Sequence, residues 1–192
     1  MTVTALDPTT ALVVIDLQKG ILALSTSPHV DEVVSHAGDL ADAFRRHGLP
    51  VVLVTVNGAA PGRTEQVRPL AARPDGWDEL APRLNRQPHD HPVKKKTWGA
   101  FTNTDLQAYL TDLGVTQVVI AGVSTSMGVE STARQAHERG FNVTLATDAM
   151  TDSNPDAHAH SITAIFPKLG ETGTTGEIID LLATTRACRS IK

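Results

Sequence analysis

The chain has 192 residues, of which 41% are hydrophobic and 20% are charged, and its formal net charge at pH 7 is −4. This length and composition suit one globular domain and argue against a disordered or collagen-like chain. The only dense basic run is the lysine triplet at 94–96, which is far too short for a nucleic-acid-binding surface, so we expect no nucleic-acid partner.

The first half of the chain alternates between strand-like and helix-like segments. Residues 11–17 (ALVVIDL) form a continuous aliphatic run, which predicts a strand buried on both faces. Apolar residues then recur at spacings of three and four across 30–47, which predicts a helix that Gly48 and Pro50 end. The run at 51–56 (VVLVTV) predicts a second buried strand.

A proline-rich segment separates the two halves of the chain. Residues 59–90 are rich in proline, glycine and arginine. We expect a long surface excursion here. Long ordered loops in compact domains tend to be functional, so this excursion is a candidate for substrate contacts.

The second half of the chain repeats the alternation. Short aliphatic runs predict strands, and segments with helical spacing, opened by polar caps or closed by glycine, predict helices. The expected strands are 92–95, 117–121 and 143–146, and the expected helices are 104–113 (capped by Thr102 or Thr104), 128–139, one that opens at Asn154-Pro155, and 177–184. This alternation predicts one α/β domain over residues 1–192, with a parallel sheet covered by helices on both faces.

Polar residues follow the expected strands, and parallel sheets bind ligands beyond the carboxyl ends of their strands. The residues at these ends are Asp16, Gln18, Asn57, Lys95 or Lys96, Ser124 to Ser126, Asp148 and Asp152. Each type has a structural alternative, because an acid after a strand often forms a turn, a lysine is usually solvated, and a turn serine often caps the next helix. Position alone therefore makes these residues candidates for a site.

Several other kinds of site find no support in the sequence. The pairs His89/His91 and His158/His160 lack further ligands at convincing spacing, so we expect no metal. There is no glycine-rich dinucleotide loop, Walker loop or GxSxG elbow, so we expect no nucleotide cofactor and no serine nucleophile of that kind. Cys188, the only cysteine, lies beyond the last expected helix and is a poor candidate for a catalytic thiol.

The sequence also favours a cytoplasmic location. A single cysteine allows no intrachain disulfide, as suits a reducing compartment. The N-terminal residues lack the charged-then-apolar pattern of a signal peptide. No apolar stretch approaches the roughly 18 residues of a membrane-spanning helix, so we expect no membrane partner.

Three segments, in order, carry a resemblance to a known family. They are VVIDLQKG (13–20), VKKKTWGAFTNTDL (93–106) and GVSTSMGVESTAR (122–134), and FNVTLATDAMTD (141–152) fits as well. Together they resemble the isochorismatase-like hydrolase family over nearly the whole chain.

The resemblance implies a three-layer α-β-α sandwich with a six-stranded parallel sheet in the order 3-2-1-4-5-6. That order would place Asp16 opposite the turn at Ser124. Lys95, six residues before Phe101, matches the family lysine in position, and Val123–Ser124 corresponds to a non-proline cis peptide bond of the family. The family also implies a homo-oligomer, either a dimer or a tetramer.

The chain departs from the resemblance at one central position. In the amidase members a cysteine nucleophile stands where this sequence has Gly128, so the covalent thiolate route is closed. True isochorismatases have glycine there and cleave a vinyl ether without a covalent intermediate. They differ in the turn, however, with Tyr and His where this chain has Ser124 and Thr125, and Cys where it has Val129. The resemblance therefore does not identify the substrate.

These observations lead to one main hypothesis and one alternative. The main hypothesis is a cysteine-independent hydrolase of a small anionic or carbonyl-bearing metabolite, with Asp16 as acid or base, Lys95 as its electrostatic partner, and a backbone N–H of Gly128 aimed at an oxygen of the substrate. The predicted substrate-binding residues are Gln18, Asn57, Arg63, Trp98, Phe101, Val123, Ser124 and Thr125, with core packing an equal alternative for the two aromatic residues. The alternative is a binding or scaffold protein that keeps the fold without a nucleophile.

Overall fold

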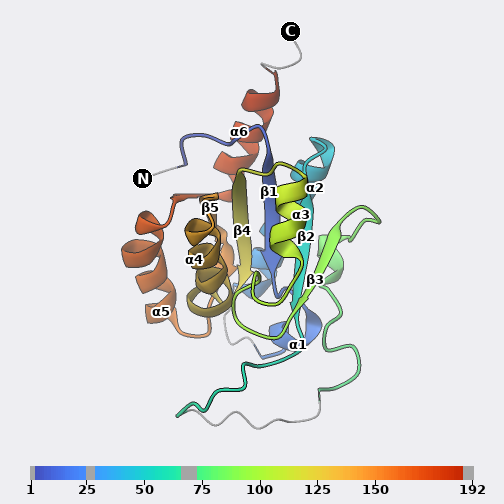
Figure 1. Cartoon of the computed structure of the whole chain (residues 1–192), viewed down its shortest axis with the longest axis vertical. Helices are drawn as coiled ribbons and strands as arrows, with labels where there is room; N and C mark the ends of the chain where they lie inside the picture. Colours follow the sequence, from blue (N-terminus) through green and yellow to red (C-terminus); the bar gives the residue numbers. More distant parts are fainter. Residues whose placement is uncertain (1–2, 25–28, 66–72, 188–192) are drawn as a thin grey trace.

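The strands form one six-stranded parallel sheet in the order β3-β2-β1-β4-β5-β6 (Figure 1). The computed structural model describes residues 3–24, 29–65 and 73–187. The strands are β1 (Thr10–Ile15), β2 (Val51–Val56), β3 (His91–Lys95), β4 (Gln117–Val123), β5 (Asn142–Thr151) and β6 (Glu171–Gly173). This order confirms the predicted fold class, and it makes β1 a central strand between β2 and β4.

Helices cover both faces of the sheet (Figure 1). They are α1 (Lys19–Leu22), α2 (Val30–Arg46), α3 (Leu106–Asp112), α4 (Glu130–Glu138), α5 (Pro155–His160) and α6 (Thr175–Ala187), with the shorter turns η1 (Pro82–Leu84), η2 (Thr125–Val129), η3 (Ser161–Ile165) and η4 (Phe166–Lys168). Apolar residues of α2 and α6 share one core cluster, whereas those of α3 and α4 belong to the other.

The alternation of side chains along β1 feeds both cores. Leu12 and Val14 point into the cluster under α2 and α6, whereas Val13 and Ile15 point into the cluster under α3 and α4. All six residues of β1 are buried, which explains why the sequence shows a continuous aliphatic run instead of a polar alternation. The carboxyl end of this central strand is thereby fixed from two sides.

The close approach of β1 and β4 depends on a glycine. Gly122 pairs with Ile15 in register and has a φ of +118°. A Cβ atom on Gly122 would lie 2.0 Å from the carbonyl oxygen of Ile15, which no side chain could tolerate. Only glycine therefore lets the ends of β1 and β4 lie side by side.

Several elements differ from the sequence-based expectation. The strand β5 runs to Thr151, with a register shift against β4 that the aliphatic run at 143–146 does not indicate. The helix expected from 128 begins instead as the π-helical turn η2, and the helix after Asn154 ends in the irregular turns η3 and η4. The predicted cap at Thr102 or Thr104 is wrong, because Asp105 occupies the N-cap of α3.

Some predictions concern what the chain lacks. Within the described ranges, no helix combines the length and apolarity that crossing a membrane requires. In the same ranges, no three His, Cys, Asp or Glu side chains are grouped so as to hold a metal ion. Cys188 lies outside the described residues, so the prediction that its thiol has no catalytic role stays a prediction.

A buried ion pair fastens the end of the excursion to α2. Nε and Nη2 of Arg45 donate to the two carboxylate oxygens of Asp90 at 3.1 and 2.7 Å, and Nη2 also donates to the carbonyl of Leu84. The Asp90 side chain is fully buried and that of Arg45 is 9% exposed. Asp90 directly precedes β3, so this pair fixes where the strand that carries Lys95 begins.

We expect Asp90→Ala to lower the free energy of unfolding by about 3 kcal/mol, because it removes the fully buried carboxylate and leaves the Arg45 guanidinium only its bonds to Asp42 and to the carbonyl of Leu84. Asp78→Ala is the matched control. It removes a 2.8 Å ion pair with Lys94 whose side chains are 64% and 35% exposed, and such pairs contribute less than about 1 kcal/mol. Urea unfolding of both variants measures the difference, and equally small effects would contradict a stabilising role for the buried pair.

Candidate active site

Asp16 follows β1 directly, and the backbone holds it in an unusual conformation. Its φ of +52° lies in the left-handed region, which aspartate tolerates better than most residues. Its N–H donates to the carbonyl of Val54 in β2, and its own carbonyl accepts from the N–H of Gln18. The residue is 5% exposed. The carboxyl group is therefore buried at the carboxyl edge of the sheet.

Lys95, the last residue of β3, contacts Asp16. Its Nζ donates to Oδ2 of Asp16 at 2.6 Å and to the carbonyl of Thr97 at 3.2 Å. Lys95 is 2% exposed, whereas Lys94 and Lys96 are exposed. The alternation of a strand thus turns one lysine of the triplet inward. Because β2 lies between β3 and β1, the long side chain spans the end of β2 to reach the carboxylate.

The electrostatics of the pair are set mainly by burial. Loss of solvent raises the pKa of Asp16 to about 6, although the ammonium of Lys95 acts in the opposite direction. Among the described residues, Oδ1 of Asp16 has no hydrogen-bond partner although it is buried. Buried polar atoms are normally paired, so this oxygen is open to a hydrogen bond from a water or from a bound molecule.

The turn after β4 lies next to this carboxylate. The peptide bond Val123–Ser124 is cis, as the resemblance implied. The carbonyl of Ser124 accepts from the N–H groups of Met127 and Val129, and the N–H of Ser126 donates to Asp152. The backbone donors that the hypothesis needs are therefore to be sought at Ser124, Thr125 and Gly128.

Gly128 brings the backbone close to the carboxyl group. A Cβ atom on Gly128 would lie 3.0 Å from Cγ2 of Ile15, 3.1 Å from the carbonyl oxygen of Val123 and 3.3 Å from Oδ2 of Asp16. All three distances are at or below ordinary van der Waals contact, so a side chain here would force its neighbours to shift. Any group on this residue would also touch the carboxylate directly.

Two side chains from outside the turn, those of Asp152 and His158, make three polar contacts with it. Oγ and the N–H of Ser126 both donate to Oδ2 of Asp152, and Oγ1 of Thr125 lies 2.8 Å from Nδ1 of His158. Burial lowers the pKa of His158, although the charge of Asp152 opposes this. The sequence suggested His158 only as half of a histidine pair too poor in further ligands for a metal, and no local signal indicated its contact with a turn 33 residues away.

The remaining predicted substrate-binding residues occupy different environments. Gln18 is fully buried, with its amide bonded to backbone groups of Val56 and Trp77. Phe101 is 5% exposed and packs in the core, whereas Trp98 is 59% exposed. Asn57 and Arg63 are exposed, and the N–H of Asn57 donates to the carbonyl of Lys95. Substrate contacts by these residues stay predictions, and Gln18 and Phe101 have structural roles of their own.

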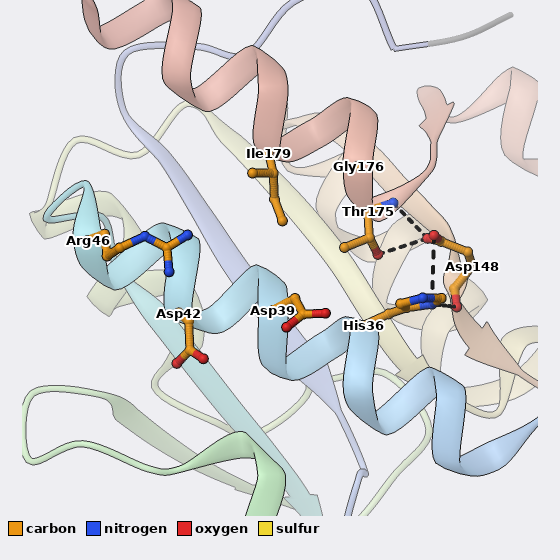
Figure 2. A pocket seen from close by; sticks show the side chains of 8 residues that line it. All are labelled: His36, Asp39, Asp42, Arg46, Asp148, Thr175, Gly176 and Ile179. Carbon is orange, nitrogen blue, oxygen red and sulfur yellow. Dashed lines mark hydrogen bonds and ion pairs between the residues drawn. The ribbon is translucent and has the colours of Figure 1, made fainter.

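A separate groove of about 410 Å³ lies between α2 and α6 (Figure 2). It is lined by His36, Asp39, Asp42, Arg46, Asp148, Thr175, Gly176 and Ile179. Asp148 was a candidate by its position after an expected strand, but it faces this groove and not the contact between Asp16 and Lys95. Oδ1 of Asp148 accepts from the N–H and the hydroxyl of Thr175 at the start of α6, and Nδ1 of His36 lies 2.8 Å from the carbonyl of Asp148. These contacts join β5, α2 and α6, so the polar groups of the groove already serve the packing of this face.

Comparisons with known proteins agree with the geometry. A family model, the isochorismatase domain, matches residues 10–177. The uncharacterized isochorismatase family protein YecD of Escherichia coli O157:H7 is 41% identical over 181 residues, which cover 91% of this chain and 96% of that protein. Streptothricin hydrolase of Streptomyces noursei is 34% identical over 149 residues, or 77% of this chain and 56% of that enzyme.

A solved structure is similar over nearly its whole length. The structure of an isochorismatase family protein from Burkholderia thailandensis matches with a TM-score of 0.89 and 40% sequence identity, and the match covers 93% of this chain and 98% of that one. The family model, which spans residues 10–177, extends over every strand of the sheet, so the end of β1, the end of β3 and the turn after β4 all lie within its matched part.

We expect Lys95→Met to raise the pKa of Asp16 above its value of about 6, because the variant removes the ammonium that favours the carboxylate and leaves the burial in place. Lys94→Met is the matched control, since Lys94 lies on the opposite side of β3 and pairs with Asp78. Carbon-13 NMR of aspartate-labelled protein measures the titration, with Asp16→Asn to assign the resonance. Equal shifts in the two lysine variants would contradict the contact.

Proposed function

The chain belongs to the isochorismatase family, and from this premise we propose that it is a hydrolase of a small metabolite that uses Asp16 and Lys95 without a covalent intermediate. The scissile bond is a C–O or C–N bond. The proposal includes a place in a subgroup of the family that has glycine where the amidases have their cysteine nucleophile. Streptothricin hydrolase, a relative at 34% identity, supports the reaction class.

One observation carries the proposal, namely the unpaired oxygen of a buried carboxylate. Lys95 occupies Oδ2 of Asp16 at 2.6 Å, whereas Oδ1 has no partner among the described residues. A structural ion pair would gain nothing from an unsatisfied buried oxygen, which costs about 1–3 kcal/mol. An oxygen that accepts a proton during a reaction must instead be left open. This asymmetry favours catalysis over a purely structural role.

The chemistry follows from the ionisation of Asp16. With a pKa of about 6, the group is mainly a carboxylate at pH 7 and takes a proton from water through Oδ1. The water oxygen forms a bond to the electrophilic carbon, and the bond from that carbon to the leaving oxygen or nitrogen breaks. The proton held by Asp16 then passes to the leaving atom, so the carboxylate is regenerated and one water is consumed.

Lys95 and the turn complete the proposed site. The Lys95 ammonium keeps the pKa of Asp16 from rising further. It also holds Oδ2 in place, which leaves Oδ1 to accept the proton of the reacting water. Backbone N–H groups of Ser124 and Gly128 would stabilise negative charge on a substrate oxygen, as such preorganised donors commonly do. Asn57, Arg63 and Trp98, all exposed, are proposed to contact the remainder of the substrate.

The second candidate is a protein that binds a small molecule without turning it over. The observation that favours it is Gly128, because the position that carries the nucleophile in the amidases has no side chain here. Under this alternative, the buried pair of Asp16 and Lys95 would serve recognition only. Turnover measurements separate the two candidates directly.

We expect hydrolysis of the true substrate to rise with pH through about 6, because only the ionised form of Asp16 accepts a proton from water. Asp16→Asn should reduce kcat by about 10²–10⁴-fold and leave the circular dichroism spectrum unchanged. The assay screens small amides, esters and vinyl ethers between pH 4.5 and 8.5. Asp78→Asn, which changes an acid exposed near Lys94, is the control and should keep full activity.

Two outcomes would contradict this assignment. Near-full activity in Asp16→Asn would remove the mechanism altogether. Activity that falls as pH rises through about 6 would mean that the protonated acid is the working form, as protonation of a vinyl ether carbon would require.

We expect Gly128→Cys to lose the native activity without gaining amidase activity, because the new Cβ would lie within 3.3 Å of Oδ2 of Asp16 and crowd Ile15. Gly128→Ala is the matched control, since it adds the same Cβ without a thiol and should lose activity to a similar degree. Turnover on the same substrate panel, with thiolate titration by ultraviolet absorbance, tests this. Strong amidase activity in Gly128→Cys alone would show that the site still accommodates a nucleophile.

A further inference from the structure

A hydroxyl outside the proposed site joins its two halves. Thr132 lies in α4, one helical turn after Gly128, and is fully buried. Its Oγ1 donates to the carbonyl of Gly128 at 2.7 Å and accepts from the N–H of Ala100 at 3.1 Å. One small group therefore contacts both the turn after β4 and the loop after β3.

The first of these bonds is ordinary, but the second is not. Threonine inside a helix often donates to the carbonyl four residues earlier, and the bond to Gly128 follows that pattern. The bond from Ala100 links residues that are 32 positions apart in the sequence. Ala100 is completely buried, so its N–H needs an internal partner, and the Thr132 hydroxyl supplies it.

The loop that Thr132 holds is the one that holds Lys95. The carbonyl of Thr97, three residues before Ala100, accepts from Nζ of Lys95 at 3.2 Å, and the same Nζ donates to Asp16. A line of polar contacts thus runs from Gly128 through Thr132 and the loop to Lys95 and the carboxylate. The bonds that Gln135 makes to Phe101 and Thr102 hold the far side of the loop, without contact to the turn.

We propose that Thr132 is a positioning residue that aligns the turn carrying Gly128 with the loop that seats Lys95 against Asp16. The inference rests on the proposed function, because it assigns Thr132 to the same site. The claim that Thr132 aligns the turn and the loop depends only on the hydrogen bonds described above. Loss of the hydroxyl removes the bond that ties Ala100 to α4 beside Gly128 and leaves only the bonds of Gln135 at the far side of the loop, so the ammonium of Lys95 is no longer held at its present distance from the carboxylate.

The ionisation of Asp16 reports this alignment without any substrate. Thr132→Val removes the hydroxyl with little change of shape, and Thr132→Ser keeps the hydroxyl. In carbon-13 NMR titrations, we expect Thr132→Val to raise the midpoint of Asp16 by about half a pH unit or more, because a displaced ammonium favours the carboxylate less. Thr132→Ser should restore the wild-type midpoint of about 6.

A buried threonine remote from the site controls for general destabilisation. Thr144 in β5 is fully buried and accepts a 3.0 Å bond from Gln117, near the opposite ends of the strands. Thr144→Val should lower the melting temperature as Thr132→Val does, yet leave the Asp16 midpoint unchanged. A midpoint in Thr132→Val equal to that of the wild type would overturn the proposal.

Hydrogen exchange at Ala100 provides a second test that needs no variant. If Thr132→Val does not fold, exchange of the Ala100 amide in the wild-type protein replaces it. Protection of that amide equal to the protection within α4 supports the proposal, and exchange at the rate of an open loop overturns it. The proposed function can also fail on its own. If the protein hydrolyses no substrate but the Asp16 midpoint still rises in Thr132→Val and returns in Thr132→Ser, the proposed function is wrong and this inference stands.

Discussion

The 2.6 Å contact between Lys95 and Asp16 is the constraint on which the rest of the site depends. Burying two charges is unfavourable unless their geometry is good, so the scaffold must fix both residues before they meet. It does so with a central strand packed on both faces and with an edge strand whose start is fastened by the bond of Arg45 to Asp90. The lysine then reaches across β2 to Oδ2 of Asp16. The other oxygen of the same carboxylate, Oδ1, has no partner among the described residues.

The order of the strands explains why three distant segments share one site. The strands all run in the same direction, but the side on which successive strands are added reverses between β1 and β4, so the segments that follow these two neighbouring strands lie at the same carboxyl edge of the sheet. Gly122 lets the two strand ends approach, and Gly128 lets the following turn come within contact of the carboxyl group. The two glycines act in different ways. Gly122 allows the backbone of β1 to come close, whereas Gly128 leaves free the space beside the carboxyl group of Asp16.

Sequence periodicity predicted the elements whose burial is uniform, such as β1 and β2, and the amphipathic helix α2, whose buried residues recur at helical spacing. It could not give the order of the strands, which came from the family resemblance, nor the three-residue strand β6, which is too short to show a period. Alternation along β3 separates Lys95 from its neighbours, but only a known site says which lysine faces inward. The contacts of Thr132 and His158 with remote backbone and hydroxyl groups leave no trace in local sequence, since they depend on packing between segments about 30 residues apart.

The left-handed backbone at position 16 limits which residues can stand there, whatever the chemistry of the site. A β-branched or long side chain in that conformation costs roughly 1–2 kcal/mol, whereas aspartate, asparagine and glycine are admitted more readily. Among these three only aspartate carries an acid. A glutamate at this position would meet the conformational penalty and would also have to fit a longer side chain into buried surroundings. The backbone conformation at position 16 and the acid chemistry proposed for the site therefore favour aspartate independently of each other.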